Sequence, residues 1–480
     1  MRIIEVIFVI SVTLSVIWVL FSRKEKKTSL FILLAADSLI CIAHALVDGF
    51  RQQMLFVYLA LLLLWFFTLL DSTGKISKRM LSKKKRRWAA GAGLSFLVLT
   101  IGLLWFFPRL NMPVPTGPYK IGTVSYEATD TDREELYGDH AGENRRIRFQ
   151  VWYPADSLDG GKQVKWLTDG KKVASGLPVV YGAPSFMMNH MGLIDSSAYS
   201  GLTISEQETS YPVVIISHGW TGFMNLHSDL GEMLASYGYI AVSINHTYGA
   251  MVTVFDDGEV VYADLNALPD RGTVEDFDKY SHALVNTFAL DAQLVLDFLE
   301  NYPAESGVLG NRLDLDHIGV LGHSTGGGGV VQLAITNPKI KAVFGMDAWV
   351  EPISPEILEK GLHIPSAFLR SEQWKTGLNN EFLQRLFNNT TVKPMIYQVV
   401  GGNHQDFSMV YMYRPITEVF GFSGSLDILE NAAIQQDFVL TFFDQELKNK
   451  KVEISALEAE YEAVVGINDF TFMNSRDNGK

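Results

Sequence analysis

Four long apolar stretches in the first 107 residues constrain this chain more than any other feature of its sequence. They run approximately over residues 3–22, 29–50, 53–70 and 88–107, and each is close to the ~20 residues that a helix needs to cross the hydrocarbon core of a bilayer. A cleavable signal peptide is the alternative for the first stretch, but three more apolar stretches follow it and no small-residue cleavage site stands out. We therefore expect residues 1–107 to form four transmembrane helices.

The basic residues between these stretches predict the orientation, because short loops rich in Lys and Arg stay on the cytoplasmic side. The first and third loops together hold 12 basic residues, and only Arg2 and Arg51 lie on the other side. With both basic loops inside, the N-terminus and everything after Phe107 lie outside. The prediction is a multi-pass protein of the cell membrane whose larger part is extracytoplasmic.

The second stretch differs from the others because it carries Asp37, His44 and Asp48. Asp37 and His44 are seven residues apart and share a face of a helix, and ionisable groups within a span often mark a path for a proton or a ligand. The alternative, which we favour, is a polar contact inside a four-helix bundle. Cys41 is the only cysteine, so the outer part must be stable without an internal disulfide.

The composition changes after Phe107. Residues 1–107 contain 14 Lys and Arg against five Asp and Glu, whereas the remaining 373 residues contain 26 against 48. With 48% hydrophobic residues and one cysteine overall, the chain is not a disordered protein, a disulfide scaffold or a basic nucleic-acid binder. Residues 108–118 hold four prolines and predict a stiff linker. A folded acidic domain is expected over residues 119–465, followed by a polar, disordered tail over residues 466–480.

Strands and helices alternate along this domain. Residues 146–153 alternate between apolar and polar side chains, as in a half-buried antiparallel strand. Continuous apolar runs, typical of parallel strands covered on both faces, occupy residues 213–217, 240–244, 318–321, 342–346, 367–369 and 396–400. Residues 281–301 have the spacing of a helix with one apolar face. The pattern predicts an α/β fold.

Residues 157–210 fit neither pattern, and we interpret them as an insertion over the sheet. They contain an apolar patch made by Phe186, Met187, Met188, Met191 and Leu193. Ordinary core packing and a surface that faces substrate or membrane remain equally good explanations of this patch.

Residues Gly322-His323-Ser324-Thr325-Gly326 have the G-x-S-x-G form of a nucleophile elbow, in which a sharp strand-to-helix turn exposes the serine hydroxyl. An apolar strand is predicted just before the motif, and the glycines after it allow a helix to pack beside the turn. The alternative is a glycine-rich turn without chemistry, which this context disfavours. Ser324 is the candidate nucleophile.

A serine hydroxyl needs a histidine base that is held in place by a carboxylate, and behind an elbow of this kind the acid precedes the histidine along the chain. After Ser324 the only histidines are His363 and His404. His404 lies just past a predicted strand, whereas His363 precedes one and falls at the wrong end of the sheet. His404 is therefore the predicted base.

Two acidic residues compete for the third position. Asp347 directly follows the strand predicted at 342–346, at the same carboxyl edge of the sheet as the elbow. Glu372, after the next strand, is the rival, and Asp406 is too near His404 in sequence to be an obvious support. We predict Asp347, with a helix cap or a surface acid as its alternative role.

An oxyanion intermediate needs backbone N–H donors in a sheltered site. We predict the N–H groups of Thr325, which follows the nucleophile, and of Trp220, where Gly219 lets the backbone turn into the site. His218 is expected to position this loop and His246 to line the cleft or serve the fold. Neither histidine has metal-ligand spacing.

Several motifs together resemble the platelet-activating-factor acetylhydrolase family of α/β-hydrolases, in its plasma and type II group. The resemblance covers about residues 115–451. Its motifs are Gly117-Pro118-Tyr119, Trp152-Tyr153-Pro154, Ser217-His218-Gly219, Gly322-His323-Ser324, Asp347-Ala348-Trp349, Ser371-Glu372 and His404-Gln405-Asp406-Phe407.

The resemblance implies an α/β-hydrolase fold, with helices on both faces of a mostly parallel sheet, and Ser324, Asp347 and His404 as the catalytic residues. It also implies that the catalytic acid is Asp347 and not Glu372, and that no metal or organic cofactor is used. The implied substrates are phospholipids with short or oxidised sn-2 chains. The chain departs from well-known members in its four predicted spans. Its elbow and its 219–222 loop also resemble those of cutinase-type polyester hydrolases.

The expectation from the sequence is thus a membrane-anchored serine hydrolase that cleaves a carboxylic ester, such as that of a lipid, through an acyl-serine intermediate. A cutinase-like or general carboxylesterase is the alternative with the same mechanism. A membrane sensor whose hydrolase-like domain only binds a ligand is the alternative of another class. The expected partners are a small-molecule or lipid ester and the bilayer, with no nucleic acid, and the oligomeric state is open.

Overall fold

The computed structural model describes residues 2–21, 27–72, 83–303, 305, 307–413 and 415–467. The expected tail, apart from residues 466 and 467, lies outside the described residues. So do most of the two basic loops, over residues 22–26 and 73–82.

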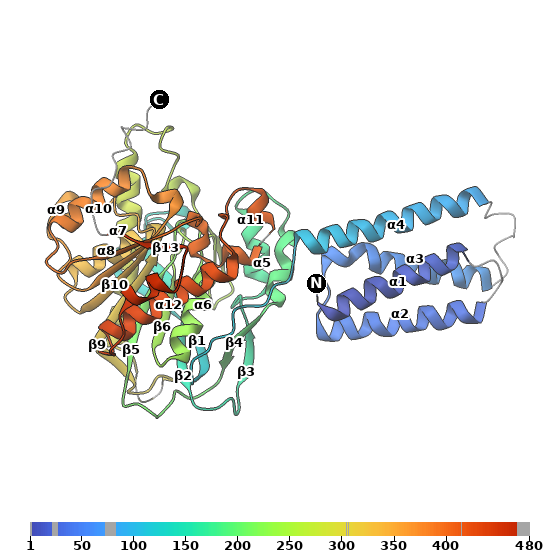
Figure 1. The fold of residues 1–480 in the computed structure, drawn as a ribbon, viewed down its shortest axis with the longest axis horizontal. Coiled ribbons are helices and arrows are strands. Elements are labelled where there is room, and N and C mark those ends of the chain that lie inside the picture. Colours follow the sequence, from blue (N-terminus) through green and yellow to red (C-terminus); the bar gives the residue numbers. More distant parts are fainter. Residues whose placement is uncertain are drawn as a thin grey trace.

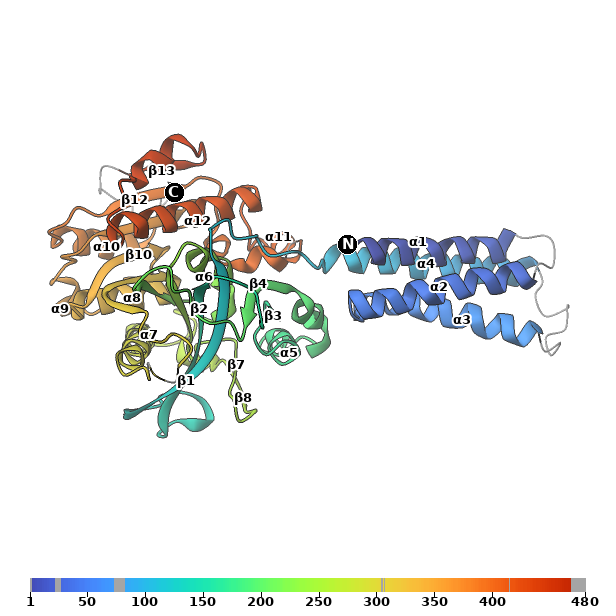
Figure 2. The same cartoon turned by 90° about the horizontal axis from the view of Figure 1, so that it is seen from below.

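Four helices at the N-terminus form a bundle that projects from one side of the larger domain (Figures 1 and 2). They are α1(Ile3–Phe21), α2(Lys27–Val47), α3(Leu55–Ser72) and α4(Lys83–Phe106). Phe8, Val12, Leu34 and Val57 are among the apolar side chains buried between them, while the outer faces also present Leu, Ile and Val. A bundle that is apolar inside and outside is typical of a membrane region.

The prediction of four membrane spans is supported for two helices only. Among the described residues, Thr28–Val47 and Gln52–Leu70 are long and apolar enough to cross a bilayer, whereas Ile3–Val19 and Gly91–Phe106 are shorter apolar helices. The run Lys83–Arg87 at the start of α4 precedes the apolar stretch of that helix. All four helices form, but in α1 and α4 the apolar stretch found among the described residues is shorter than the sequence pattern indicated.

Asp37 and His44 are both buried in the bundle, and each bonds to a neighbouring helix. Asp37 accepts hydrogen bonds from Ser11 and, at 2.7 Å, from Ser15. His44 Nε2 lies 2.8 Å from the Tyr58 hydroxyl oxygen. Both side chains therefore make polar contacts between helices, which is the role that we favoured for them.

A twisted sheet of eleven strands forms the centre of the larger domain, in the order β13-β12-β11-β10-β9-β5-β6-β2-β1-β4-β3. The strands from β6 to β12 in this order are parallel, and β2 and β13 run antiparallel to their neighbours. Their bounds are β1(Lys120–Glu134), β2(Asn144–Ala155), β3(Lys162–Lys165), β4(Asp195–Ser200), β5(Tyr211–Ser217), β6(Ile240–Asn245), β9(Leu313–His323), β10(Ile340–Met346), β11(Ser366–Ser371), β12(Met395–Val399) and β13(Val464–Gly466), with β7(Val252–Val254) and β8(Val260–Tyr262) in a separate hairpin.

Helices cover both faces of this sheet, as the unalternating strands predict. Side chains of α7 and α8 pack on one face, and side chains of α6 and α12 pack on the other (Figure 2). The helices of the domain are α5(Lys171–Val179), α6(Ser228–Ser236), α7(Phe277–Glu300), α8(Ser324–Thr336), α9(Pro355–Leu358), α10(Leu378–Asn388), α11(Ile416–Val419) and α12(Ile428–Glu446). The α/β prediction of a mostly parallel sheet between helices is confirmed.

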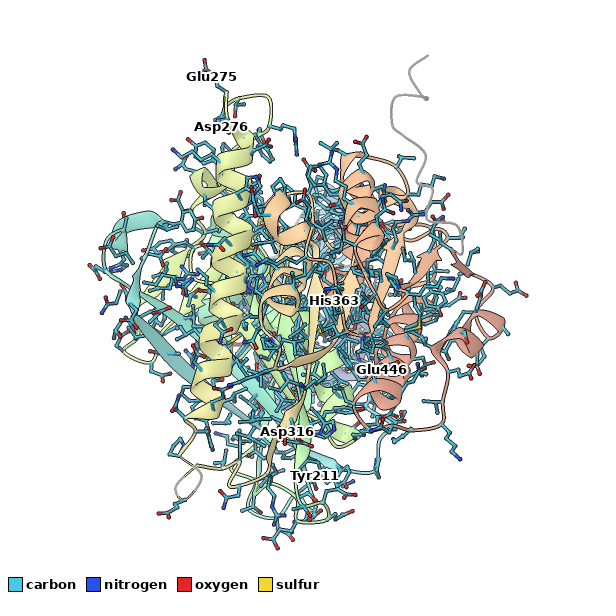
Figure 3. The ribbon with its side chains drawn as sticks, turned by 90° about the vertical axis from the view of Figure 1, so that its left-hand side faces the viewer. Tyr211, Glu275, Asp276, Asp316, His363 and Glu446 are labelled. Carbon is cyan, nitrogen blue, oxygen red and sulfur yellow. The ribbon has the colours of Figure 1, made fainter. Side chains whose placement is uncertain are left out.

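Parallel strands bring their starts to one edge of the sheet and their ends to the other. Figure 3 shows Tyr211, the first residue of β5, and Asp316, early in β9, together at one edge, and Asp276, next to the start of α7, at the opposite end. The carboxyl ends of β5, β9 and β10 therefore meet at the edge away from Tyr211.

Strand β2 was expected to be half-buried, but almost all of its residues are buried on both faces. Gln150, expected to face solvent, accepts hydrogen bonds from Thr168 and Asn225, each at 2.8 Å, and the buried Arg148 lies 3.1 Å from Asp169. Residues 157–210 and the α6 region cover this face, so an alternating pattern here marks buried polar contacts and not contact with water.

The insertion at 157–210 contributes β3 and β4 to the sheet edge and places α5 and a 3-10 helix, η3(Ser185–Leu193), beside the bundle (Figure 1). Its apolar patch fits both explanations in part. Met191 is fully buried, as in core packing, whereas Phe186 is exposed on the surface. The expected linker at 108–118 contains no helix, but Arg109 and Met112 within it are buried, so the segment is packed against the domain.

Candidate active site

Ser324 lies at the turn between β9 and α8, with a backbone φ of 55°. This left-handed conformation is costly for a serine and is typical of a strained functional turn. Gly326 allows the turn, because a Cβ at that position would lie 2.3 Å from the His218 carbonyl oxygen. The Trp349 N–H donates to the Ser324 carbonyl at 2.9 Å and ties the turn to the end of β10.

His404 begins a 3-10 helix, η7(His404–Phe407), shortly after β12. Its Nε2 lies 3.0 Å from Ser324 Oγ, within the range that proton transfer requires. Asn403 caps η7 in a capping box with Asp406, and this cap holds the loop in shape. Asp406 therefore supports the backbone of the histidine loop rather than the imidazole.

Asp347 directly follows β10 and is almost completely buried. Its Oδ2 lies 2.9 Å from His404 Nδ1. Ser371 donates its N–H to Oδ1 at 2.8 Å and its hydroxyl to Oδ2 at 2.5 Å. These bonds orient the carboxylate toward the imidazole, so that Nδ1–H donates to Asp347 and Nε2 accepts from Ser324.

The two rival residues lie away from this arrangement. Glu372 accepts the Gly401 N–H at 2.8 Å and pairs with Lys375 at 3.0 Å, so it braces the loop that precedes His404. His363 lies 2.9 Å from the Thr391 hydroxyl, before the start of β11. The structure thus brings Ser324, His404 and Asp347 together and leaves Glu372 and His363 outside.

The predicted oxyanion loop follows β5 and lies directly against the serine. A Cβ on Gly219 would be 2.9 Å from Ser324 Cβ, so the backbone approaches as closely as glycine permits. Among the described residues, the Trp220 N–H has no hydrogen-bond partner. Thr325 is the second residue of α8, where N–H groups have no acceptor within the helix. Both predicted donors therefore come from backbone beside Ser324.

Three contacts of the site were not predicted. The Trp374 indole stacks on the His404 imidazole, with ring centroids 4.3 Å apart and planes inclined by 4°. His323 donates from Nε2 to the His404 carbonyl at 2.9 Å, and burial holds the pKa of His323 well below its ordinary value, so it stays neutral. The third is Ser371. The motif Ser371-Glu372 was part of the family resemblance. The sequence around Ser371 does not by itself predict that this serine faces Asp347.

Neither His218 nor His246 contacts the reacting groups. His218 Nδ1 donates to the Gly219 carbonyl at 2.7 Å, and burial lowers the pKa of both histidines. Among the residues that the structure describes, no group of three or more His, Cys, Asp or Glu side chains could hold a metal ion.

Comparisons with known proteins agree with this architecture. The chain is 23% identical over 329 residues to platelet-activating factor acetylhydrolase of Cavia porcellus, which covers 64% of this chain and 70% of that protein. It is 24% identical over 373 residues to the Gallus gallus enzyme, covering 71% and 85%, and 28% identical over 158 residues to cutinase est1 of Thermobifida alba, covering 32% and 42%.

A solved ferulic acid esterase from Streptomyces cinnamoneus has the same fold, with a TM-score of 0.63, 21% identity, and coverage of 75% of this chain and all of that one. The family model for platelet-activating factor acetylhydrolase, isoform II, matches residues 104–261 and 298–462. That match spans more than half of the sequence, and the chain therefore belongs to the platelet-activating factor acetylhydrolase isoform II family.

Proposed function

We propose that this protein is a membrane-anchored serine hydrolase that cleaves carboxylic esters. The observation that carries the proposal is the continuous chain from Ser324 Oγ to His404 Nε2 at 3.0 Å and from His404 Nδ1 to Asp347 Oδ2 at 2.9 Å. Family membership and the acetylhydrolase, cutinase and esterase relatives support the same class of reaction.

The reaction begins when His404 Nε2 takes the Ser324 proton as Oγ bonds to the ester carbonyl carbon. The carbonyl oxygen becomes an oxyanion, which accepts hydrogen bonds from the N–H groups of Trp220 and Thr325. When the tetrahedral intermediate collapses, the bond to the leaving oxygen breaks, and that oxygen takes the proton from His404. Water then attacks the acyl-serine in the same way, giving the acid and free Ser324. Asp347 stabilises the imidazolium that forms in each half.

Phospholipids with a short or oxidised sn-2 acyl chain are the proposed substrates, since the matched relatives are platelet-activating factor acetylhydrolases. The bundle supports membrane anchoring. The ends of α1 and α3 and the starts of α2 and α4, which flank the basic segments, lie at the end remote from the catalytic domain (Figure 1). By the charge rule for loops, this arrangement supports the proposal that the catalytic domain is extracytoplasmic.

A cutinase-like or general carboxylesterase is a second candidate, favoured by the 28% identity to cutinase est1 over 158 residues. It shares the mechanism and differs in the acyl and alcohol groups that the site accepts. Activity against a panel of acyl lengths and headgroups separates the two. A preference for water-soluble or polymeric esters over phospholipids would assign the second.

Replacement of the nucleophile tests the proposal directly. In the purified full-length protein, Ser324→Ala should abolish both hydrolysis of short-chain p-nitrophenyl esters and labelling by a fluorophosphonate. His404→Ala should lower the rate ~10³-fold or more, whereas His363→Ala, the matched control, should retain it. Undiminished activity of Ser324→Ala would refute the mechanism. A wild-type protein that reacts with no serine probe would favour a ligand-binding sensor.

A further inference from the structure

A line of buried polar side chains runs beneath the oxyanion loop, which comprises residues 219–222. Ser217 Oγ lies 2.8 Å from His246 Nε2, and His246 Nδ1 lies 2.9 Å from Asp291 Oδ2. The order of groups is the same as in the candidate active site. All three side chains are fully buried, so no substrate reaches them, and the line serves the protein itself.

The surroundings of Asp291 fix which atoms of this line carry protons. Asp291, on α7, pairs with Arg145 and Arg133, each at 2.6 Å. Burial by itself would raise the pKa of Asp291, but the arginines and His246 hold it well below its ordinary value, and burial lowers the pKa of His246. Asp291 is thus an anion that can only accept, so the neutral imidazole carries its proton on Nδ1. His246 Nε2 is left to accept the Ser217 hydroxyl.

The same reasoning fixes the proton of His218, the residue before the loop. The His246 N–H donates to His218 Nε2 at 3.3 Å. A backbone N–H can only donate, so this Nε2 carries no proton. Because burial holds the pKa of His218 well below its ordinary value, the ring is neutral and its proton lies on Nδ1. The Nδ1–H donates to the Gly219 carbonyl at 2.7 Å.

The Gly219 carbonyl and the Trp220 N–H belong to one peptide unit. In a planar trans peptide these two groups point in opposite directions. The Gly222 N–H also donates to the Gly219 carbonyl, at 2.9 Å, so two donors hold this oxygen on one side. The Trp220 N–H, the predicted oxyanion donor, is thereby held on the other side. If the peptide turned over, its carbonyl oxygen would face the oxyanion and repel it.

His246 is itself held in place, and its segment also holds the far end of the loop. The Phe288 ring, on α7, stacks on the imidazole, with centroids 3.8 Å apart and planes inclined by 17°. The Thr221 N–H donates to the Gly249 carbonyl at 2.9 Å, and the Gly249 N–H donates to the His246 carbonyl at 2.9 Å. The segment that begins at His246 therefore supports the oxyanion loop at both ends.

We propose that Asp291, acting through His246 and His218, sets the orientation of the peptide that presents the Trp220 N–H to the oxyanion. The three side chains are positioning residues, because they act through the loop and not on the ester. This inference rests on the proposed serine hydrolase. Asp291 lies in neither of the stretches that the family model matches, so it stands outside the part of the chain that defines the family.

The first test replaces His218 in the detergent-solubilised, full-length protein. His218→Leu removes the donor to Gly219, whereas His218→Asn places an amide N–H at the same number of bonds from the backbone as Nδ1. His218→Leu should lower kcat per titrated active site by about 10–100-fold with KM unchanged, and weaken inhibition by a trifluoromethyl ketone by the same factor. His218→Asn should recover most of both. Equal losses in the two variants, an unchanged kcat in both, or a loss of titratable sites with unchanged kcat per site would overturn the inference.

The second test asks whether Asp291 acts through the histidines. Asp291→Asn should lower kcat per titrated site by about tenfold, and its loss should not add to that of His218→Leu in the double variant. Ser217→Ala, which removes the other partner of the His246 ring without removing a charge, makes the same comparison should Asp291→Asn fail to fold. Ser243→Ala is the control, because its hydroxyl is also buried in a central strand but bonds to a carbonyl outside the line. Additive losses, or an equal loss in the control, would contradict the proposal.

The third test needs no activity, so it separates failure of this inference from failure of the proposed function. Hydrogen exchange followed by mass spectrometry reports on the amides of the oxyanion loop, which donate to the Gly249 and Gly219 carbonyls. In His218→Leu and in Ser217→Ala these amides should exchange about tenfold faster than in the wild type, while β10 exchanges as before. In Ser243→Ala both regions should match the wild type. Unchanged exchange of the loop, or an equal rise in β10, would refute the proposed positioning role.

Discussion

The indole of Trp374 lies flat on the imidazole of His404, with centroids 4.3 Å apart and planes inclined by 4°. An aromatic face attracts a cation above it, and such contacts contribute about 0.5–2 kcal/mol. In the proposed mechanism the imidazole is cationic only while a tetrahedral intermediate forms and collapses. The stacking therefore favours the transition state over the resting enzyme.

Trp374→Ala should accordingly lower kcat by a factor of roughly 3–30, with a smaller change in KM, and Trp374→Phe should recover part of the loss. Steady-state kinetics on a soluble p-nitrophenyl ester measure both. Equal kcat for the wild type and both variants would show that the stacked ring contributes only packing.

Separate replacement of Asp347 and Glu372 tests which carboxylate serves His404. Asp347→Asn removes the acceptor of the Nδ1 proton and should lower kcat by ~10³–10⁴-fold. Glu372→Gln alters only the bonds to Gly401 and Lys375, and should keep activity within about tenfold. The reverse order of the two effects would assign the acid to Glu372.

The turn at Ser324 has no room for a side chain at position 326. A Cβ on Gly326 would lie 2.3 Å from the His218 carbonyl oxygen and 2.4 Å from that of Ser217, and two central backbone segments have no room to separate. Gly326→Ala should lower the free energy of unfolding by about 1–3 kcal/mol or more and reduce activity with it. Gly272→Ala, where a Cβ meets nothing within 4 Å, is the control for thermal melting. Equal melting temperatures for the two variants would contradict this reading of the turn.

The buried acids of α6 predict how stability depends on pH. Burial raises the pKa of Glu232 from its ordinary 4.5 to about 7 and that of Asp229 from 3.8 to about 6. Both groups thus keep a proton in the native state that the unfolded chain has lost. Their favourable contribution is complete below the unfolded pKa values and is lost as the pH rises from about 4 to about 7, amounting to roughly 3 kcal/mol at most for Glu232.

Glu232→Gln should therefore flatten the decline in melting temperature over this window, from about pH 4 to about pH 7. Glu359→Gln, at an exposed position, should leave the decline as in the wild type. Thermal melting of the detergent-solubilised protein at several pH values measures the difference, and parallel pH profiles for all three proteins would exclude Glu232 as its source.

Much of the fold and of the candidate site is local in origin and could be predicted from the sequence. The unalternating runs of β5, β9 and β10 predicted buried parallel strands, and the glycines around Ser324 predicted the turn. The positions of Asp347 and His404 just after strands also followed, because parallel strands end at the same edge of the sheet.

The tertiary structure decided the rest, because those features depend on residues far apart in the chain. Both Asp347 and Glu372 follow strands at the same edge, and only the packing of Ser371 and the His404 loop distinguishes the acid that faces the imidazole from the one that braces the backbone. The polar face of β2 suggested water, but the folded insertion at 157–210 and the segment before α6 cover it. Likewise, apolar composition alone indicated four spans, whereas within the described residues two of the four helices are long and apolar enough to cross a bilayer. Local patterns specify which elements form, and contacts between distant segments specify what each polar side chain meets.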